Sequence, residues 1–213
     1  MLKNLIAKED APQIANLRRA GAIVIGRTNS PAFAMRATTD NALHGLTLNP
    51  WDKAVTCGGS SGGAGASIAA GIGALAQGND IGGSIRWPSY CNGIVGLRPS
   101  IGRVPAHNAS ASAPRAFAAQ IMSANGPMAR SVRDIRLALR ILAEGDPRDP
   151  MWTPAPVDPP PKIDDIVEIL FTPGGFDETN HGTAPLAYAE AARLMEVFNP
   201  DLCPPQFGYP HAV

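Results

Sequence analysis

Glycine is concentrated in one stretch of this chain, and that stretch limits what the chain can fold into. Residues 57–102 contain 13 of the 22 glycines. Two clusters of glycine and serine stand out there, GGSSGG at 58–63 and GGS at 82–84. Glycine lets the backbone turn sharply and bring its N–H groups close to a ligand. The clusters therefore predict tight turns that present serine, either for acyl-transfer chemistry or as plain Gly/Ser-rich turns without chemistry.

Composition excludes several classes of protein. Hydrophobic residues make up 45% of the 213 residues and charged residues 17%, as in chains that fold around a core. The formal net charge is zero, whereas nucleic-acid binders usually carry a basic excess. Three widely spaced cysteines predict neither a disulfide framework nor a zinc site. No signal-peptide core or membrane-spanning apolar segment is found, so we expect a cytoplasmic protein with neither nucleic-acid nor membrane partners.

The chain changes character near Gly145. Residues 145–213 contain 13 of the 21 prolines and carry a net charge of −8, against +8 for the rest of the chain. Successive prolines block helices and central strands, so 145–162 is predicted to be a linker or an extended crossing segment. Beyond it, IVEIL at 166–170 predicts a strand, and 184–197 predicts an amphipathic helix.

The first part of the chain predicts a helix followed by a strand. Asp10 can cap a helix over 11–20, and Gly21 would end it. The apolar run AIVIG at 22–26 predicts a buried strand, and the polar segment 28–56 predicts mostly loop. A helix that leads into a buried strand is typical of an α/β arrangement.

Three further elements are predicted along the chain. Small residues at 63–76 predict a closely packed helix, with a glycine loop as the alternative. IVGL at 94–97 predicts a short buried strand. Ser131 and Asp134 have the spacing of a capping box, and apolar residues follow at helical spacing, so 132–143 is predicted to be a helix.

Other glycine-loop motifs fit this sequence poorly. A phosphate-binding P-loop needs a lysine after its glycines, and no lysine occurs between Lys53 and Lys162. The dinucleotide fingerprint G-x-G-x-x-G fails because GIG at 71–73 is followed by Ala-Leu-Ala. The nucleophile elbow G-x-S-x-G is matched around Ser60, although NPWDKAVTC before it is a poor strand. The elbow stays open as an alternative, and it would need a histidine close to Ser60 in space.

Six segments occur in an order and at spacings that resemble one enzyme family. They are EDAPQIANLRRAGAIVIGRTNSPAFA, TLNPWD, GGSSGG, NDIGGSIR, CNGIVGLRPSIGRVP and GPMARSVRDIRLALRIL, and together they cover about residues 9–150. The chain thereby resembles the amidase signature family. The resemblance implies an α/β fold with a mixed β-sheet between helices, in which residues 1–150 form a partial amidase signature core. Residues 151–213 would add a proline-rich crossing segment, a strand and a helix to the same domain.

The resemblance also implies a Ser–cis-Ser–Lys triad. Ser84 in GGSIR would be the nucleophile, and Ser60 in GGSSGG, preceded by a cis peptide bond, would relay its proton. Ser61 would support the hydrogen-bond network, and Arg86 would brace the nucleophile loop. Serine needs a base, and a buried neutral lysine can act as one through a second hydroxyl. The oxyanion hole would consist of the N–H groups of Ile81, Gly82, Gly83 and Ser84.

The implied reaction is hydrolysis of a small-molecule carboxylic amide to an acid and ammonia or an amine. It would proceed through a Ser84 acyl-enzyme and need neither a metal nor an organic cofactor. Homo-oligomer formation is left open. One alternative is the glutamine-hydrolysing component of an amidotransferase, which uses the same triad on glutamine and passes on the ammonia within a complex. The other is a non-catalytic amidase remnant that acts only as a binding partner.

The triad lysine has no counterpart in a matching motif. In the family it lies upstream of the segment that begins EDAP here. Lys3 and Lys8 lie outside any matching motif, and Lys53 lies in the turn after NPWD. We therefore expect a fragment without the upstream lysine segment and much of the C-terminal part, with weak activity or none.

Some conspicuous side chains have no assigned chemistry. The triad needs no histidine, so surface or structural positions are expected for His44, His107, His181 and His211. Candidates either for an acyl pocket or for the ordinary core are Trp87, Phe117 and Met122.

Overall fold

A computed structural model of the chain describes residues 6–108, 110 and 116–157. They belong to the first of the two units into which the chain divides, Met1–Asp158. The strand predicted at 166–170 and the helix predicted at 184–197 lie outside the described residues, and the domain limits drawn from the sequence stay predictions. Within the described part, no helix combines the length and the apolar character needed to cross a membrane.

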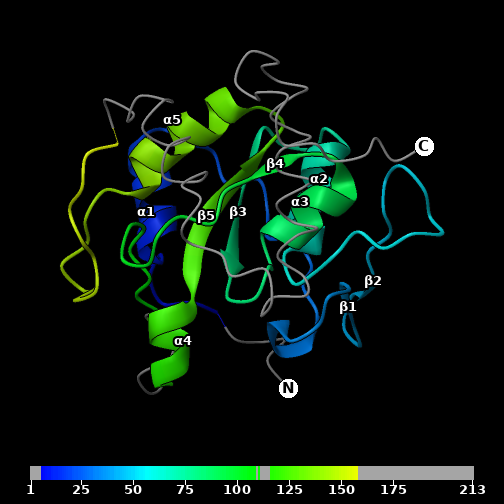
Figure 1. Cartoon of the computed structure of the whole chain (residues 1–213), viewed down its shortest axis with the longest axis horizontal. Helices are drawn as coiled ribbons and strands as arrows, with labels where there is room; N and C mark the ends of the chain where they lie inside the picture. The colour runs from blue at the N-terminus through cyan, green and yellow to red at the C-terminus, as the bar shows by residue number, and fades with distance from the viewer. Residues whose placement is uncertain (1–5, 109, 111–115, 158–213) are drawn as a thin grey trace, which may run out of the picture. The chain divides into compact units, whose positions relative to one another are not determined.

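A three-stranded sheet forms the centre of the described unit (Figure 1). Its strands, in spatial order, are β3 (Leu75–Asp80), β5 (Ala124–Ala129) and β4 (Val95–Gly96). β5 is buried along its whole length and runs antiparallel to both neighbours. Leu75 pairs with Ala129 and Asp80 with Ala124, so the carboxylate at the end of β3 lies at the start of β5.

Helices cover both faces of this sheet, which confirms the α/β arrangement. In Figure 1, α1 (Pro12–Arg19) and α5 (Val132–Leu142) lie to one side of the strands, and α2 (Gly62–Ala69) and α3 (Arg86–Asn92) to the other. Neighbouring strand residues point to opposite faces. Accordingly, Leu75 packs against a core of Leu17, Val104, Ala138 and Leu142, and Ala76 packs against one of Ala64, Ile85 and Met128.

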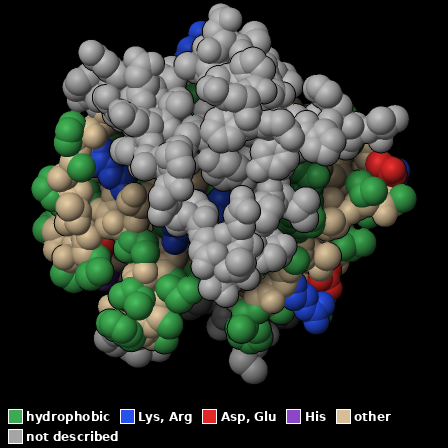
Figure 2. All heavy atoms as spheres, viewed as in Figure 1, with side chains coloured by type: hydrophobic (Ala, Val, Ile, Leu, Met, Phe, Trp, Pro, Cys, Tyr) green, Lys and Arg blue, Asp and Glu red, His purple; other side chains and the backbone are tan. Residues whose placement is uncertain are grey.

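The remaining elements are short. They are a 3-10 turn at Ala32–Ala34, the hairpin strands β1 (Asp40–Asn41) and β2 (Gly45–Leu46), and α4 (Phe117–Met122). The prediction that 28–56 is mostly loop is therefore confirmed. Helix α4 carries exposed apolar side chains, which Figure 2 shows as a hydrophobic patch, and Phe117 is 74% and Met122 47% exposed. Neither of these two residues is core.

Both helices with clear end signals are confirmed. Ser131 caps α5, and its hydroxyl accepts the N–H of Asp134 at 3.2 Å, as the capping box predicts. α1 begins one residue later than expected, because Ala11 occupies the cap position and makes no side-chain cap bond. Asp10 instead pairs with Arg18 at 3.1 Å, so its predicted capping role is wrong.

The strand predicted at 22–26 is absent from the described structure. The segment is not in a sheet, and Ile23 is 87% and Ile25 70% exposed. An apolar run has a preference for extended backbone, but a strand also needs a partner for its N–H and C=O groups. No described segment supplies that partner, so this prediction is wrong for the described residues.

The small-residue segment 63–76 combines a helix with other structure. α2 covers its first half, the chain turns at Gly71 with φ +76°, and β3 begins at Leu75. The strand predicted at 94–97 is confirmed as the half-buried β4. β5 was not predicted, because Gly126 and Pro127 lie in its middle and are rare in central strands.

The described part of the proline-rich segment packs onto the unit as a crossing segment. Thr153 donates its N–H to the carbonyl oxygen of Gly102 at 2.8 Å. The indole of Trp152 donates to the carbonyl oxygen of Ala143 at 3.0 Å. Asp149 accepts the N–H of Ala106 at 2.7 Å. These bonds hold residues 149–153 against the unit. A free linker, the other interpretation of this segment, could therefore begin only after Thr153.

Replacing Gly63 with alanine is expected to lower the free energy of unfolding by about 1–3 kcal/mol, as overpacking usually does. A Cβ on Gly63 would lie 2.5 Å from the carbonyl oxygen and 2.6 Å from the nitrogen of Asn29, and neither is a movable side-chain end. Gly26 has no atom within 4 Å of such a Cβ, so Gly26→Ala is the matched control. Urea unfolding of both variants is the measurement, and equal midpoints would contradict the close approach of α2 to Asn29.

Candidate active site

The two serine-bearing loops meet although Ser60 and Ser84 are 24 residues apart. The N–H of Ser61 donates to the carbonyl oxygen of Ser84 at 3.1 Å. Ser60 is 6% exposed and follows a cis peptide bond from Gly59, as the family resemblance implies. Among the described residues, the hydroxyls of Ser60 and Ser84 are not hydrogen-bonded to each other. The two loops are thus in direct backbone contact.

The Ser60 loop is held from several sides. Thr39 is fully buried, and its hydroxyl donates to the carbonyl oxygen of Gly58 at 2.8 Å. The side-chain amide of Asn92 donates to the carbonyl oxygen of Cys57 at 2.8 Å. A Cβ on Gly59 would lie 2.5 Å from the carbonyl oxygen of Arg36, so only glycine fits there. These contacts fix the backbone just before Ser60.

Ser61 joins this loop to the helix and the sheet behind it. It is the cap residue of α2, whose N-terminus therefore lies directly after Ser60. The hydroxyl of Ser61 lies 3.4 Å from the N–H nitrogen of Asn79 on β3. The positive end of a helix dipole favours negative charge nearby, so this position suits a serine oxygen that loses its proton.

The Ser84 loop is organised around a buried carboxylate, Asp80, at the end of β3. Asp80 has no exposed surface and accepts the N–H groups of Gly83 at 2.8 Å and Ile85 at 3.0 Å. The Arg86 guanidinium binds both of its oxygens, at 3.1 and 2.9 Å. Burial alone would raise the pKa of Asp80, but the bonds from Arg86 and from the backbone outweigh it and lower the pKa to about 2.

A second arginine lies against the same carboxylate. Nε of Arg98 is 3.5 Å from Oδ1 of Asp80, and the Arg98 side chain is 25% exposed. Arg98 also donates to the carbonyl oxygen of Met122 at 2.8 Å. Asp80 therefore stays ionised at neutral pH and connects the Ser84 loop to the end of α4 and the start of β5.

The four predicted oxyanion N–H groups differ in whether they already donate a hydrogen bond. The N–H of Gly83 already donates to Asp80, so this group is occupied in the structure. No described residue accepts the N–H groups of the other three, Ile81, Gly82 and Ser84. Free backbone donors beside two serine hydroxyls can bind a carbonyl oxygen and stabilise the negative charge that develops during acyl transfer.

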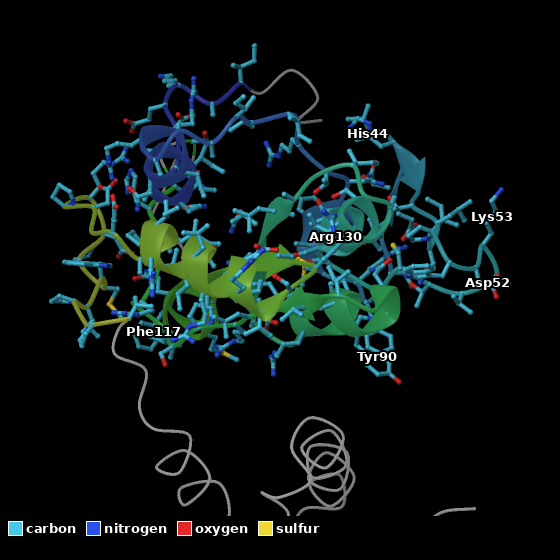
Figure 3. The ribbon with its side chains drawn as sticks, turned by 90° about the horizontal axis from the view of Figure 1, so that it is seen from above. His44, Asp52, Lys53, Tyr90, Phe117 and Arg130 are labelled. Atoms are coloured by element: carbon cyan, nitrogen blue, oxygen red, sulfur yellow. The ribbon has the colours of Figure 1, made fainter. Side chains whose placement is uncertain are left out.

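No lysine among the described residues serves this serine pair. Lys8 and Lys53 are exposed, and neither hydrogen-bonds to Ser60 or Ser84. Lys53 lies in a loop and points away from the body of the unit (Figure 3). The described structure therefore contains no counterpart of the triad lysine.

The nucleophile-elbow alternative loses support. The residues just before Ser60 form no strand apart from a single bridge between Leu48 and Thr56, whereas an elbow needs a strand there. His44 and His107 form no hydrogen bond with Ser60, and His44 points outward in Figure 3. The other two histidines predicted to be surface or structural, His181 and His211, lie outside the described residues.

Sequence reasoning missed Asp80 and Thr39. A usable signal existed for Asp80, because an acid at the end of an uncharged segment and an arginine six residues later flank the Gly-Gly-Ser turn. Opposite charges on the two sides of a turn indicate that the two side chains pair, because a buried carboxylate needs hydrogen-bond partners. Thr39 lies in a polar loop whose sequence has no such signal.

Comparison with known proteins is consistent with this site. A model of the Amidase family matches residues 1–169. Indoleacetamide hydrolase from Bradyrhizobium diazoefficiens is 53% identical over 207 residues, covering 94% of this chain and 40% of the relative. The A component of the glutamyl-tRNA(Gln) amidotransferase from a Roseiflexus species is 43% identical over 157 residues, covering 74% of this chain and 31% of the relative.

Comparison with solved structures also finds members of the amidase signature family. A bacterial aryl acylamidase of the amidase signature family matches with a TM-score of 0.65 and 39% identity, over 72% of this chain and 31% of that chain. The chain thus spans less than half the length of each of these relatives. Because the family match extends over residues 1–169 and the fold agrees with that of a solved member, the chain belongs to the amidase signature family.

Proposed function

We propose that this chain carries the acyl-transfer site of an amide hydrolase, with Ser84 as the nucleophile and Ser60 as the proton relay. The observation that carries the proposal is the hydrogen bond of 3.1 Å between the N–H of Ser61 and the carbonyl oxygen of Ser84. It joins the two serine loops near the N–H groups of Ile81 and Gly82, which no described residue accepts. In this role, Asp80 and Arg86 position the Ser84 loop.

The proposed reaction has two stages. The Ser84 oxygen attacks the amide carbonyl carbon, and its proton passes to the Ser60 oxygen, whose own proton goes to a base. Free N–H donors of the Ser84 loop stabilise the oxyanion. When the C–N bond breaks, the leaving nitrogen takes up a proton and departs as ammonia or an amine. Water then attacks the acyl-enzyme, releases the acid and returns a proton to Ser84.

An arylacetamide is the proposed substrate class. The support is the 53% identity to indoleacetamide hydrolase over nearly the whole of this chain. A glutamine amidase in an amidotransferase complex is the second candidate, and the 43% identity to the Roseiflexus amidotransferase component supports it less strongly. Cytoplasmic location and homo-oligomer formation stay predictions.

The test is to incubate the full chain with indoleacetamide or with glutamine and to measure the ammonia released. Hydroxylamine is added to a parallel sample, because it intercepts an acyl-enzyme as a hydroxamate that mass spectrometry detects. We expect ammonia and hydroxamate from indoleacetamide and neither in the Ser84→Ala variant. With the base absent from the described residues, the rate is expected to be about 10²–10⁴-fold below that of a complete amidase. Product from glutamine alone would favour the second candidate, and no product from either amide would overturn the proposal.

A further inference from the structure

We infer that Trp87 and Tyr90 on α3 form an aromatic platform that selects aryl over alkyl acyl groups at the Ser84 site. The inference rests on the proposed function and assigns its specificity to two named side chains. The rings stack with centroids 5.8 Å apart and an interplanar angle of 18°. Trp87 is 40% and Tyr90 77% exposed, so the stack is not core packing. Figure 3 shows Tyr90 pointing out from α3.

Trp87 is hydrogen-bonded to the Ser84 loop and to a segment that lies against Gly59. Its backbone N–H donates to the carbonyl oxygen of Gly83 at 2.7 Å, next to Ser84. Its indole N–H donates to the carbonyl oxygen of Ala37 at 2.9 Å. The carbonyl carbon of Ala37 would lie 2.9 Å from a Cβ on Gly59, the residue before Ser60. The indole therefore lies between α3, which begins two residues after Ser84, and the Ala37 segment that packs against the residue before Ser60.

The indole is also fixed in orientation. Its N–H bond to Ala37 satisfies the polar group of the ring, and Tyr90 one helical turn later supports one ring face. A rigid aromatic surface loses little conformational entropy when a ligand binds to it. An aryl acyl group can stack on it with the edge-to-face or offset geometry that aromatic rings prefer, and a cyclohexyl group of similar size cannot.

The test measures binding of phenylacetamide and cyclohexylacetamide to the full chain by ligand-observed NMR, which needs no chemistry at Ser84. We expect phenylacetamide to bind about two- to twelvefold more tightly, the range typical of one aromatic pair. Trp87→Leu should remove that preference, and Trp87→Phe should restore most of it. Phe33→Leu is the matched control, because Phe33 is an exposed aromatic residue on the 3-10 turn at Ala32–Ala34, and it should leave the preference unchanged.

Two further measurements make the outcome decisive. Tyr90→Leu changes a side chain that is mostly exposed, so it tests the platform even if Trp87→Leu fails to fold, and it should reduce the preference several-fold. Bound phenylacetamide should also slow the labelling of Ser84 by a fluorophosphonate. Equal binding of the two amides, or a preference unaffected by both leucine variants, would overturn the inference. A ring-dependent preference without hydrolysis would uphold the platform while the proposed function failed.

Discussion

Replacing Ser84 with alanine is expected to abolish labelling of this protein by a fluorophosphonate, a loss of at least about 10³-fold in rate. The reagent phosphonylates a serine oxygen that lies beside oxyanion donors, and no described residue accepts the N–H groups of Ile81, Gly82 and Ser84 in this loop. Peptide mass spectrometry of the labelled chain should locate the adduct on Ser84.

Two other serines make the experiment specific. Ser60→Ala removes the proposed proton relay and should slow labelling by about 10²–10⁴-fold without moving the adduct. Ser67 on α2 is the control, because its hydroxyl donates to the carbonyl oxygen of Ala64 at 2.8 Å and has no role in the site. Labelling that moved to Ser60 and survived Ser84→Ala would refute the proposed roles and favour the nucleophile elbow.

The second large effect is expected from Asp80→Asn, which should lower the free energy of unfolding by about 2–3 kcal/mol at pH 7, because Asp80 is a buried, hydrogen-bonded charge whose partner Arg86 is 57% exposed. The asparagine amide carries no charge for Arg86 and Arg98, and its NH₂ group cannot accept the backbone N–H groups that Asp80 binds. Urea unfolding is the measurement. Asp52→Asn on an exposed loop is the control, and it should change stability by less than about 0.5 kcal/mol.

The pH dependence of the same variant follows from the pKa of Asp80. Folding lowers that pKa from 3.8 to about 2, so ionised Asp80 stabilises the folded state above pH 4. This contribution, about 2 kcal/mol, should be lost as the pH falls from 4 through 2. The difference in stability between wild type and Asp80→Asn should therefore shrink over that range. A difference that stayed constant from pH 7 to pH 2 would show that Asp80 is not held as an ionised group.

Much of the candidate site was predictable from motifs alone. The positions of Ser60 and Ser84 follow from GGSSGG and NDIGGSIR, and the structure brings these loops into contact. The residues that hold the two loops in place were harder to predict from the sequence. The charges of Asp80 and Arg86 on either side of the turn are a sequence signal for their pairing, but only the structure shows that β3 ends at Asp80 and buries its carboxylate. The occupied N–H of Gly83 is a consequence of the same burial.

The helices were predictable where their signals are local. The Ser131 cap and the apolar spacing of α5 act over three or four residues, so neighbours in sequence are also neighbours in space. The small residues of α2 likewise anticipate the close approach of Asn29 to Gly63, although the partner itself could not be named.

The sequence by itself determined the family, the two serine turns and the helices with local end signals. Only the tertiary structure decided which apolar segments become strands, since 22–26 stays exposed whereas β5, with a glycine and a proline inside it, is buried. It also decided that the indole of Trp87 reaches Ala37, 50 residues away. The physical reason is that strand pairing and the burial of charge depend on partners distant in sequence, whereas caps and turns depend on adjacent residues.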